Sequence, residues 1–532
     1  MSTRVGPLPV VGPRPGVRIR WRPYTPAMLL SSAPARPDQV VAVARGGERV
    51  DVDPRVRAVM APARRAVERA LVDRDVVYGV TTGFGALADT VIPTEDADHL
   101  QHALVRSHAA GMGPPVEDEV VRAMTLLRAR TLAAGHTGAR FDVVTALVDL
   151  LNAGIRVYVP EHGSLGASGD LAPMAHVGVV LTGEGWVRDD HDRPADAMPA
   201  LTAARLTPLR LRVKDGLALL NATEGMLAML VLAVVDLQRL ADAADLACAL
   251  SVEALLATDG PYAQRLQELR PHAGQQTAAA NLRRWLADSP ILASHRDSRH
   301  AVQDAYALRC APQVHGAARD LITFAEHTRD IELGASIDNP VVLDDGHIES
   351  CGNFHGQPLA FALDVLAMAS AELGAISERR TDRLLDRSRS HGLPPFLASQ
   401  AGVESGFMLA QYTAASMVAE NRRLAVPAST DSIPTSGMQE DHVSLGWSAG
   451  RKLRRSLANL ERILAIETLV AAAGVEVRAP IRPGPRTGAA IARLREDIPP
   501  MPTDRFLAAD LEAARRLVHD GVLLQAAGTA TT

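Results

Sequence analysis

A stretch of more than forty residues without proline begins after Lys214 and reads DGLALLNATEGMLAMLVLAVVDLQRLADAADLACALSVEALLA. Its apolar residues recur every three or four positions, which is the spacing of one face of an α-helix. Similar runs cover roughly 355–392, 400–424 and 440–475. Helices of this length are stabilised mainly by packing against one another, so the sequence predicts an elongated helical bundle.

The first half of the chain is more segmented. Between about Val50 and Ala200, helical stretches alternate with breaks rich in Gly, Pro and Asp. We therefore expect a mainly α protein, in which a segmented, mostly helical N-terminal domain precedes the elongated central bundle. The predicted parts are a loosely ordered N-terminal arm, the N-terminal domain, the helical bundle domain, and a C-terminal linker with a helical tail, at 1–45, 46–213, 214–478 and 479–532.

Composition narrows the class of protein. The chain is 47% hydrophobic and has a net charge of −5, which offers no basic field for nucleic acid. The longest apolar run, 226–235, is too short to cross a bilayer, so we expect no membrane span. The three cysteines, Cys248, Cys310 and Cys351, are far apart and odd in number, which argues against disulfides and zinc-type sites. We predict a cytoplasmic protein without a catalytic metal.

The segment GSLGASGDLAP, residues 163–173, carries a single central serine, Ser168, between closely spaced glycines. A hydrolase nucleophile elbow would need glycine where Asp170 stands, and no alternating strand and helix pattern surrounds the segment. A phosphate-binding loop would need a Gly-Lys-Ser/Thr sequence, which is missing here. A flexible glycine turn that leads into a helix is the ordinary alternative.

A third interpretation uses the backbone of the segment as a reagent. If the amide nitrogen of Gly169 attacks the carbonyl carbon of Ala167 and two waters are lost, residues 167–169 form a methylidene-imidazolone ring with an electrophilic carbon. Small residues are required because a bulky side chain would block this close approach. Asp170 is a plausible N-cap of the next helix, whose positive end would favour negative charge on the ring oxygen.

The segment resembles the prosthetic-group motif of the aromatic amino acid ammonia-lyases and aminomutases, which act on histidine, phenylalanine or tyrosine. Five more motifs follow the family order, namely YGVTTGFG, LALLNATEG, VQDAYALRCAPQ, GNFHG and MQEDHVS, at 78–85, 217–225, 302–313, 352–356 and 438–444. The resemblance implies that Ala167, Ser168 and Gly169 form the methylidene-imidazolone autocatalytically, with no exogenous cofactor. It also implies an amino acid substrate and a homo-oligomer, a tetramer whose active sites combine residues of several subunits.

The resemblance also implies roles for single residues. Tyr78 would be the base that removes the substrate β-proton, for which its pKa must lie below the ordinary value of about 10. Arg309 would bind the substrate carboxylate through a bidentate pair. Gln303 and Tyr306 lie at three-residue steps from it, so on a helical turn they would share a broad face. Gln303 would contact the carboxylate, and Tyr306 would assist proton transfer or contact the ring. Each residue also has a structural alternative, such as a packed aromatic ring or a surface ion pair.

Four further residues complete the predicted site. Asn221 would hydrogen-bond near the ring, because asparagine is a poor residue inside a helix, and Phe354 would form a hydrophobic wall. His108, in the Ser-His pair at the selectivity position of the family, can hydrogen-bond an imidazole or a phenol. Glu440 resembles the glutamate that histidine lyases have at this position, where phenylalanine lyases have a glutamine. A carboxylate can pair with an imidazole N–H. A capping histidine and a solvated acidic cluster are the alternatives.

The predicted reaction is conversion of L-histidine to trans-urocanate and ammonia. The sequence leaves open a tyrosine ammonia-lyase or a tyrosine or histidine 2,3-aminomutase, since tyrosine 2,3-aminomutases also resemble the Ser-His pattern. A non-catalytic scaffold with an uncyclised loop is a further alternative. Two positions depart from the histidine lyases, which usually have glycine where Ala222 stands and often asparagine or serine where Thr81 stands.

Overall fold

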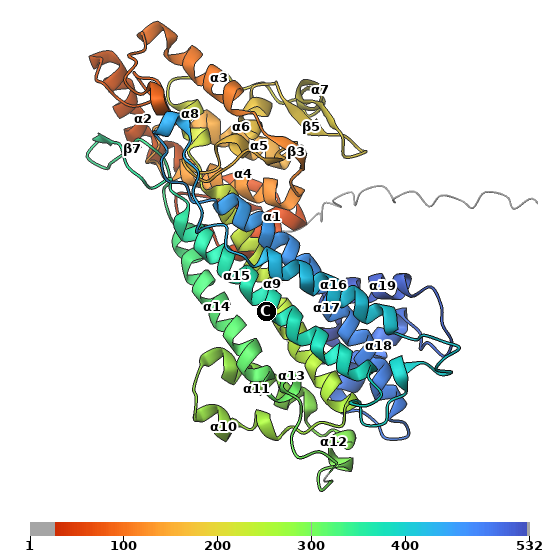
Figure 1. Cartoon of the computed structure of the whole chain (residues 1–532). Helices are drawn as coiled ribbons and strands as arrows, with labels where there is room; N and C mark the ends of the chain where they lie inside the picture. The colour runs from red at the N-terminus through yellow and green to blue at the C-terminus, as the bar shows by residue number, and fades with distance from the viewer. Residues whose placement is uncertain (1–26, 299, 529–532) are drawn as a thin grey trace, which may run out of the picture.

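The structure is a computed structural model that describes residues 27–298 and 300–528. It is mainly helical, and five helices form an elongated bundle in its centre (Figure 1). These helices are α9 (Glu224–Ala254), α14 (Ala311–Glu332), α15 (Gln357–Leu385), α16 (Met408–Leu424) and α17 (Gly446–Val477). The predicted fold class is confirmed, and the apolar periodicity of the long runs is the reason: nearly every residue of α9 is buried between its neighbours.

The N-terminal domain sits at one end of the bundle. Its helices are α1 (Pro37–Gly46), α2 (Val56–Asp73), α3 (Ala97–His108), α4 (Asp118–Ala133), α5 (Phe141–Asn152), α6 (Leu171–Leu181), α7 (Ala197–Ala203) and α8 (Asp215–Leu220). At the other end lie α10 (Gln264–Glu268), α11 (Ala273–Leu286), α12 (Pro290–Ser294) and α13 (Tyr306–Arg309). The C-terminal helices are α18 (Pro485–Asp497), α19 (Leu507–His519) and α20 (Val522–Ala526).

Short strands pair two by two and build no larger sheet in the described residues. The parallel pair is β1 (Met28–Leu30) with β2 (Val50–Val52). The antiparallel pairs are β3 (Met112–Pro115) with β4 (Pro160–His162), β5 (Trp186–Arg188) with β6 (Pro194–Asp196), and β7 (Val341–Val342) with β8 (Ile348–Glu349).

The prediction that residues 1–45 form a loosely ordered N-terminal arm is wrong for residues 28–45. Residues 28–30 form β1, with Leu30 fully buried, and α1 packs on α4 through its apolar face, including Val40 and Val43. The proline-rich appearance of the first residues hid this, because the apolar spacing that places α1 in the core starts only after Pro37. The remainder of the predicted arm, 1–26, lies outside the described residues.

One bundle helix is long and apolar enough, by length and composition, to cross a membrane. This helix is α15, and 67% of its most apolar window is buried inside the protein. It packs against α9, α14, α16 and α17, which occupy its apolar face. Its hydropathy is therefore explained by its central place in the bundle, as in core helices of other proteins.

Candidate active site

The glycine-rich segment 163–173 forms a tight loop before α6. Gly166 and Gly169 have φ values of 67° and 79°, a left-handed conformation that glycine adopts without strain. A Cβ on Gly169 would lie within 2.7 Å of the Ala222 carbonyl carbon and closer still to its oxygen. The Asp170 amide donates a hydrogen bond of 2.5 Å to that same oxygen. The loop is thus pressed against Ala222, and only a residue without a side chain fits at Gly169.

The Asp170 side chain holds the 163–173 loop in place through hydrogen bonds. Asp170 is the residue before α6, as predicted, but its carboxylate makes no capping bond to that helix. Instead the carboxylate accepts hydrogen bonds from the Met226 amide at 2.8 Å and the Ser164 hydroxyl at 2.9 Å. Complete burial raises the pKa of Asp170 to about 7. The side chain therefore ties the loop to the start of α9 rather than to the helix that it precedes.

Ser168 opens into a cavity of about 470 Å³ between the loop, α3, α8 and the segment before α17. A volume of this size suits an amino acid. The structure brings five predicted residues together around it, and these are Tyr78, His108, Ser168, Asn221 and Glu440. The rest of the lining is largely apolar and comes from the 83–92 loop and from leucines of α3, α6 and α8.

Glu440 is the carboxylate of this cavity. Its Oε1 accepts a hydrogen bond of 3.2 Å from the Ser168 hydroxyl, and its Oε2 accepts one of 2.7 Å from Thr435. A short backbone bridge between Thr435 and Glu440 fixes the turn that carries the side chain. The carboxyl group is therefore held next to the predicted reacting loop.

His108 lies at the end of α3, where its Nδ1 is 2.9 Å from the Leu104 carbonyl oxygen. A carbonyl can only accept, so Nδ1 carries the proton and Nε2 is left as an acceptor in the neutral ring. Burial lowers the pKa of His108, which keeps the ring neutral near pH 7. The residue can therefore accept a hydrogen bond from an imidazole N–H or from a phenol.

The pKa of Tyr78 moves in the opposite direction from the prediction. Burial raises it, and a hydrogen bond of 3.0 Å that the hydroxyl accepts from the Gly85 amide opposes this only in part. The Glu440 carboxylate raises the pKa of Tyr78 further, because two negative charges would repel each other. The groups around Tyr78 in the described residues therefore raise its pKa, whereas a base requires a lowered one.

Asn221 is fixed by a buried ion pair that the sequence analysis missed. Its Nδ2 donates to the Asn339 carbonyl at 2.7 Å, and the carboxylate of Asp338 accepts from the Asn339 amide at 2.8 Å. Lys214 contacts the other oxygen of Asp338 at 2.9 Å, and both side chains are 1% exposed or less. A signal was available, because the sequence contains only two lysines, Lys214 and Lys452, among its many arginines.

Gln303, Tyr306 and Arg309 do not reach this cavity within the chain. Asn221 lies three residues before the start of α9. Gln303 lines a separate surface pocket together with Leu256, which lies two residues after the end of α9. At 1.5 Å per residue, the 31 residues of α9 separate the two groups by about 45 Å. Figure 1 shows α13 and α8 at opposite ends of the bundle.

The helical turn predicted for Gln303, Tyr306 and Arg309 is correct for Tyr306 and Arg309 only. The helix α13 begins at Tyr306, and Ala305 before it is extended, so Gln303 is not on the same turn. Tyr306 is exposed, and the Arg309 guanidinium stacks on its ring at 4.5 Å. Phe354 is half-buried in the loop before α15 and does not line the cavity.

Comparison with known proteins identifies the group to which this arrangement belongs. The model of the family described as aromatic amino acid lyase matches residues 35–496. The chain belongs to this family. Within it, a histidine ammonia-lyase of Streptomyces avermitilis is 53% identical over 493 residues, which cover 92% of this chain and 96% of that protein.

Two solved structures of aromatic amino acid lyase relatives have the same fold. The histidine ammonia-lyase of Trypanosoma cruzi is 37% identical with a TM-score of 0.87, covering 94% of this chain and 95% of that one. The tyrosine aminomutase of Streptomyces globisporus is 36% identical with a TM-score of 0.87, covering 94% and 98%. The resemblance stated from the motifs is confirmed at the level of the family.

Proposed function

We propose that this protein converts L-histidine to trans-urocanate and ammonia. The observation that carries the proposal is the Glu440 carboxylate, which lies 3.2 Å from the Ser168 hydroxyl in an otherwise largely apolar cavity. This carboxylate can accept a hydrogen bond from an imidazole N–H, whereas a phenyl ring offers it no donor. The histidine ammonia-lyases that are about half identical to this chain support the same substrate.

We propose that Ala167, Ser168 and Gly169 form the methylidene-imidazolone of this family. The loop fits the group, because Gly169 has no room for a side chain and both neighbours of Ser168 are small. When formed, the group supplies an electrophilic carbon for the substrate amine. The chain's own residues then hold the substrate: Glu440 and His108 contact the imidazole, and Asn221 hydrogen-bonds beside the loop.

We propose that Gln303, Tyr306 and Arg309 complete the cavity of a neighbouring subunit in a tetramer. Their surroundings support this, because Val302 and Tyr306 are 102% and 70% exposed in the single chain and would be covered in an oligomer. The Nε of Arg309 is buried without a hydrogen-bond partner among the described residues. A guanidinium brought close to Tyr78 would lower the pKa of that hydroxyl, which is the direction that a base needs.

Hybrid oligomers test this arrangement. A Ser168→Ala subunit and an Arg309→Ala subunit are each expected to be inactive as homo-oligomers. If sites combine residues from two subunits, co-expression of both variants produces some sites with neither substitution, and part of the activity returns. If each site is built within one chain, every site carries a substitution and co-expression restores nothing.

The substrate proposal is tested by a panel of histidine, tyrosine and phenylalanine with product identification. The wild type is expected to release urocanate from histidine, and Glu440→Gln is expected to lose histidine turnover selectively. Asp441→Asn is the matched control, because Asp441 is the exposed neighbouring carboxylate. Coumarate or β-tyrosine as the main product would instead establish the tyrosine lyase or aminomutase, with which the Ser107-His108 pair is also compatible.

Intact mass distinguishes an enzyme from a scaffold. A purified chain lighter than its sequence by two waters supports the cyclised loop, and the full mass supports the non-catalytic alternative.

We further propose a cytoplasmic enzyme that acts on a free amino acid and binds neither nucleic acid nor membranes, since its net charge is −5. No group of three potential metal ligands occurs in the described ranges.

A further inference from the structure

The N-terminal domain contains a second cavity, on the side of α6 away from the active-site loop. This cleft has a volume of about 480 Å³ and lies between α5, the ends of α6 and α7, and the 205–212 segment. The helix α6 lines both cavities, because its first residue, Leu171, faces the active site and its last, Leu181, faces the cleft. The proposed reaction leaves this cleft without a role.

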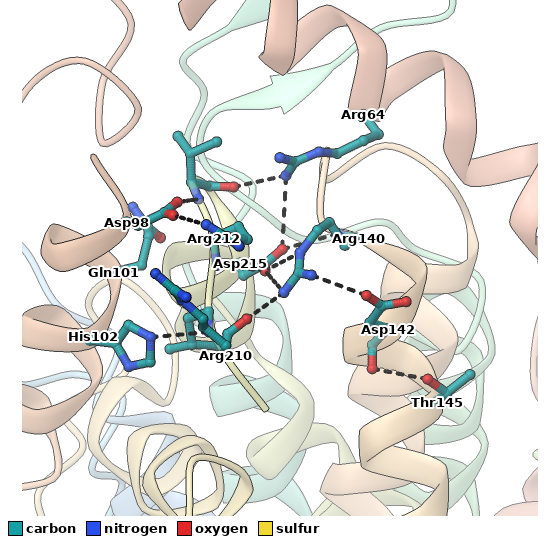
Figure 2. Close-up of polar contacts among 12 residues, drawn as sticks. Arg64, Asp98, Gln101, His102, Arg140, Asp142, Thr145, Arg210, Arg212 and Asp215 are labelled. Carbon is teal, nitrogen blue, oxygen red and sulfur yellow. Dashed lines mark hydrogen bonds and ion pairs between the residues drawn. The ribbon is translucent and has the colours of Figure 1, made fainter. Parts of the chain in front are cut away.

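Four arginines line the cleft, and two of them are neutralised. Arg140 pairs with Asp215 at 2.7 Å and with Asp142 at 3.0 Å, and Arg212 pairs with Asp98 at 2.6 Å. Figure 2 shows these pairs joined in one network. The carboxylates of the network are used by Arg140 and Arg212, so they are not available to the other two arginines.

The other two arginines, Arg205 and Arg210, are exposed, and their guanidinium groups have no carboxylate within ion-pair distance among the described residues. The backbone that carries Arg210 is nonetheless fixed. Its carbonyl accepts a bond of 2.6 Å from Arg140, and the next amide, of Leu211, donates to His102 Nε2 at 3.1 Å (Figure 2). Two unpaired positive charges are thus presented at one cleft, and hydrogen bonds hold the backbone at Arg210.

Apolar side chains also line the cleft. They come from α5, α6, α7 and the connecting segment, and we call them the leucine floor: Leu150, Leu181, Leu201, Leu206, Pro208 and Leu209. Thr145, Thr207, Asp142 and Asp149 also line the cleft, and the Thr145 hydroxyl donates a hydrogen bond of 3.0 Å to the Asp142 carbonyl. Because Arg140 and Arg212 are neutralised by aspartates, only the unpaired guanidinium groups of Arg205 and Arg210 favour an anion at this cleft, and the leucine floor favours one with a carbon skeleton.

We propose that this cleft binds a small organic molecule whose charged end carries two negative charges, such as a phosphate monoester or a dicarboxylate. Arg205 and Arg210 bind the oxyanion oxygens, because a guanidinium matches phosphate and carboxylate geometry with paired N–H donors. The carbon skeleton lies on the leucine floor. An extended nucleic acid is a poor fit, because the chain as a whole has a net charge of −5.

The position of the cleft also predicts an effect on the active site. The 205–212 segment is bonded to Asp98 and His102 of α3 and to Asp215 of α8. The same two helices line the active-site cavity, α3 with His108 and α8 with Leu217 and Leu220. A ligand that tightens the segment therefore acts on two walls of the catalytic cavity, and we expect it to change the KM for the amino acid.

Calorimetric titration of the intact oligomer at fixed ionic strength tests the site. The probes are inorganic phosphate, glycerol 3-phosphate and glutarate. The test variant is Arg205→Gln/Arg210→Gln, and the matched control is Arg265→Gln/Arg270→Gln, which removes two exposed arginines at α10 and directly after it. We expect at least one organic probe to bind once per chain, at least tenfold more weakly to the test variant, and unchanged to the control.

The two organic probes distinguish a phosphate ester from a dicarboxylate. If inorganic phosphate binds more weakly than the organic probes, the result supports a contact between the carbon skeleton and the leucine floor. The proposal is overturned if no organic probe binds the wild type at millimolar concentration, or if the test variant binds as well as the wild type. A probe that changes the KM of the wild type but not of the test variant supports the coupling, and an unchanged KM overturns it. Calorimetry does not depend on which amino acid the enzyme converts, so this test stands apart from the proposed function.

Discussion

Replacing Gly169 with alanine tests the packing on which the reactive loop depends. Two costs are expected, and the structure separates them. The φ of 79° costs a residue with a side chain about 1–2 kcal/mol. The new methyl group would also lie within 2.7 Å of the Ala222 carbonyl carbon, where carbon atoms normally stay about 3.5–4.0 Å apart. The backbone must therefore move by about 1 Å, which adds about 1–3 kcal/mol.

Two other glycines supply controls for these costs. Gly392 has a φ of 90° with nothing within 4 Å of its added Cβ, so Gly392→Ala is expected to show the conformational cost alone. Gly352 has open space and no such φ, so Gly352→Ala is expected to leave stability unchanged or slightly higher. Free energies of unfolding from denaturant titration at one protein concentration would rank the variants in this order, with Gly169→Ala about 2–5 kcal/mol less stable than the wild type.

The same variant reports on the chemistry of the loop. A displaced backbone at residue 169 moves the amide nitrogen that is proposed to attack Ala167, so intact mass is expected to show the full, uncyclised chain. The reasoning is refuted if Gly169→Ala unfolds like Gly392→Ala and still loses two waters. Loss of activity with the two waters still lost and stability unchanged would also contradict it, because the substitution is argued to act through the packing and the cyclisation of the loop.

Two further perturbations concern buried charges. Asp338→Asn leaves Lys214 buried without its partner and should lower the free energy of unfolding by about 3–5 kcal/mol, which thermal unfolding would measure. Turnover should also be lost, because Asn221 is no longer fixed, and an activity assay would measure this loss. Burial, with a contribution from Glu224, raises the pKa of Glu332 to about 7 from its usual 4.5. The folded state then binds more protons than the unfolded state across that window, so stability falls as the pH rises from about 4.5 to 7. Glu332→Gln removes this loss and should stabilise the protein by about 2–3 kcal/mol at pH 8 but not at pH 4, as thermal unfolding at both values would show.

The long helices could be predicted because their apolar spacing is set by packing within one bundle. The run after Lys214 nevertheless contains a break that the spacing does not reveal. Residues 221–223 leave the helical conformation between α8 and α9, because the Ala222 carbonyl is used by the Asp170 amide and the Asn221 amide group is used by Asn339. These partners are distant in the sequence, so local periodicity carries no sign of them.

The candidate site shows a second limit of the same kind. The motifs around Ser168 and Glu440 could be placed in one cavity because the fold brings them together within a chain. The motif that carries Arg309 occurs in the same family order, yet the length of α9 keeps it about 45 Å from that cavity. Motif order along a sequence records which residues a site needs but not which copy of the chain supplies them. A helix this long cannot fold back to close such a gap, so the catalytic role proposed for Arg309 requires a second subunit, and under that proposal activity is expected to disappear when the chains are separated.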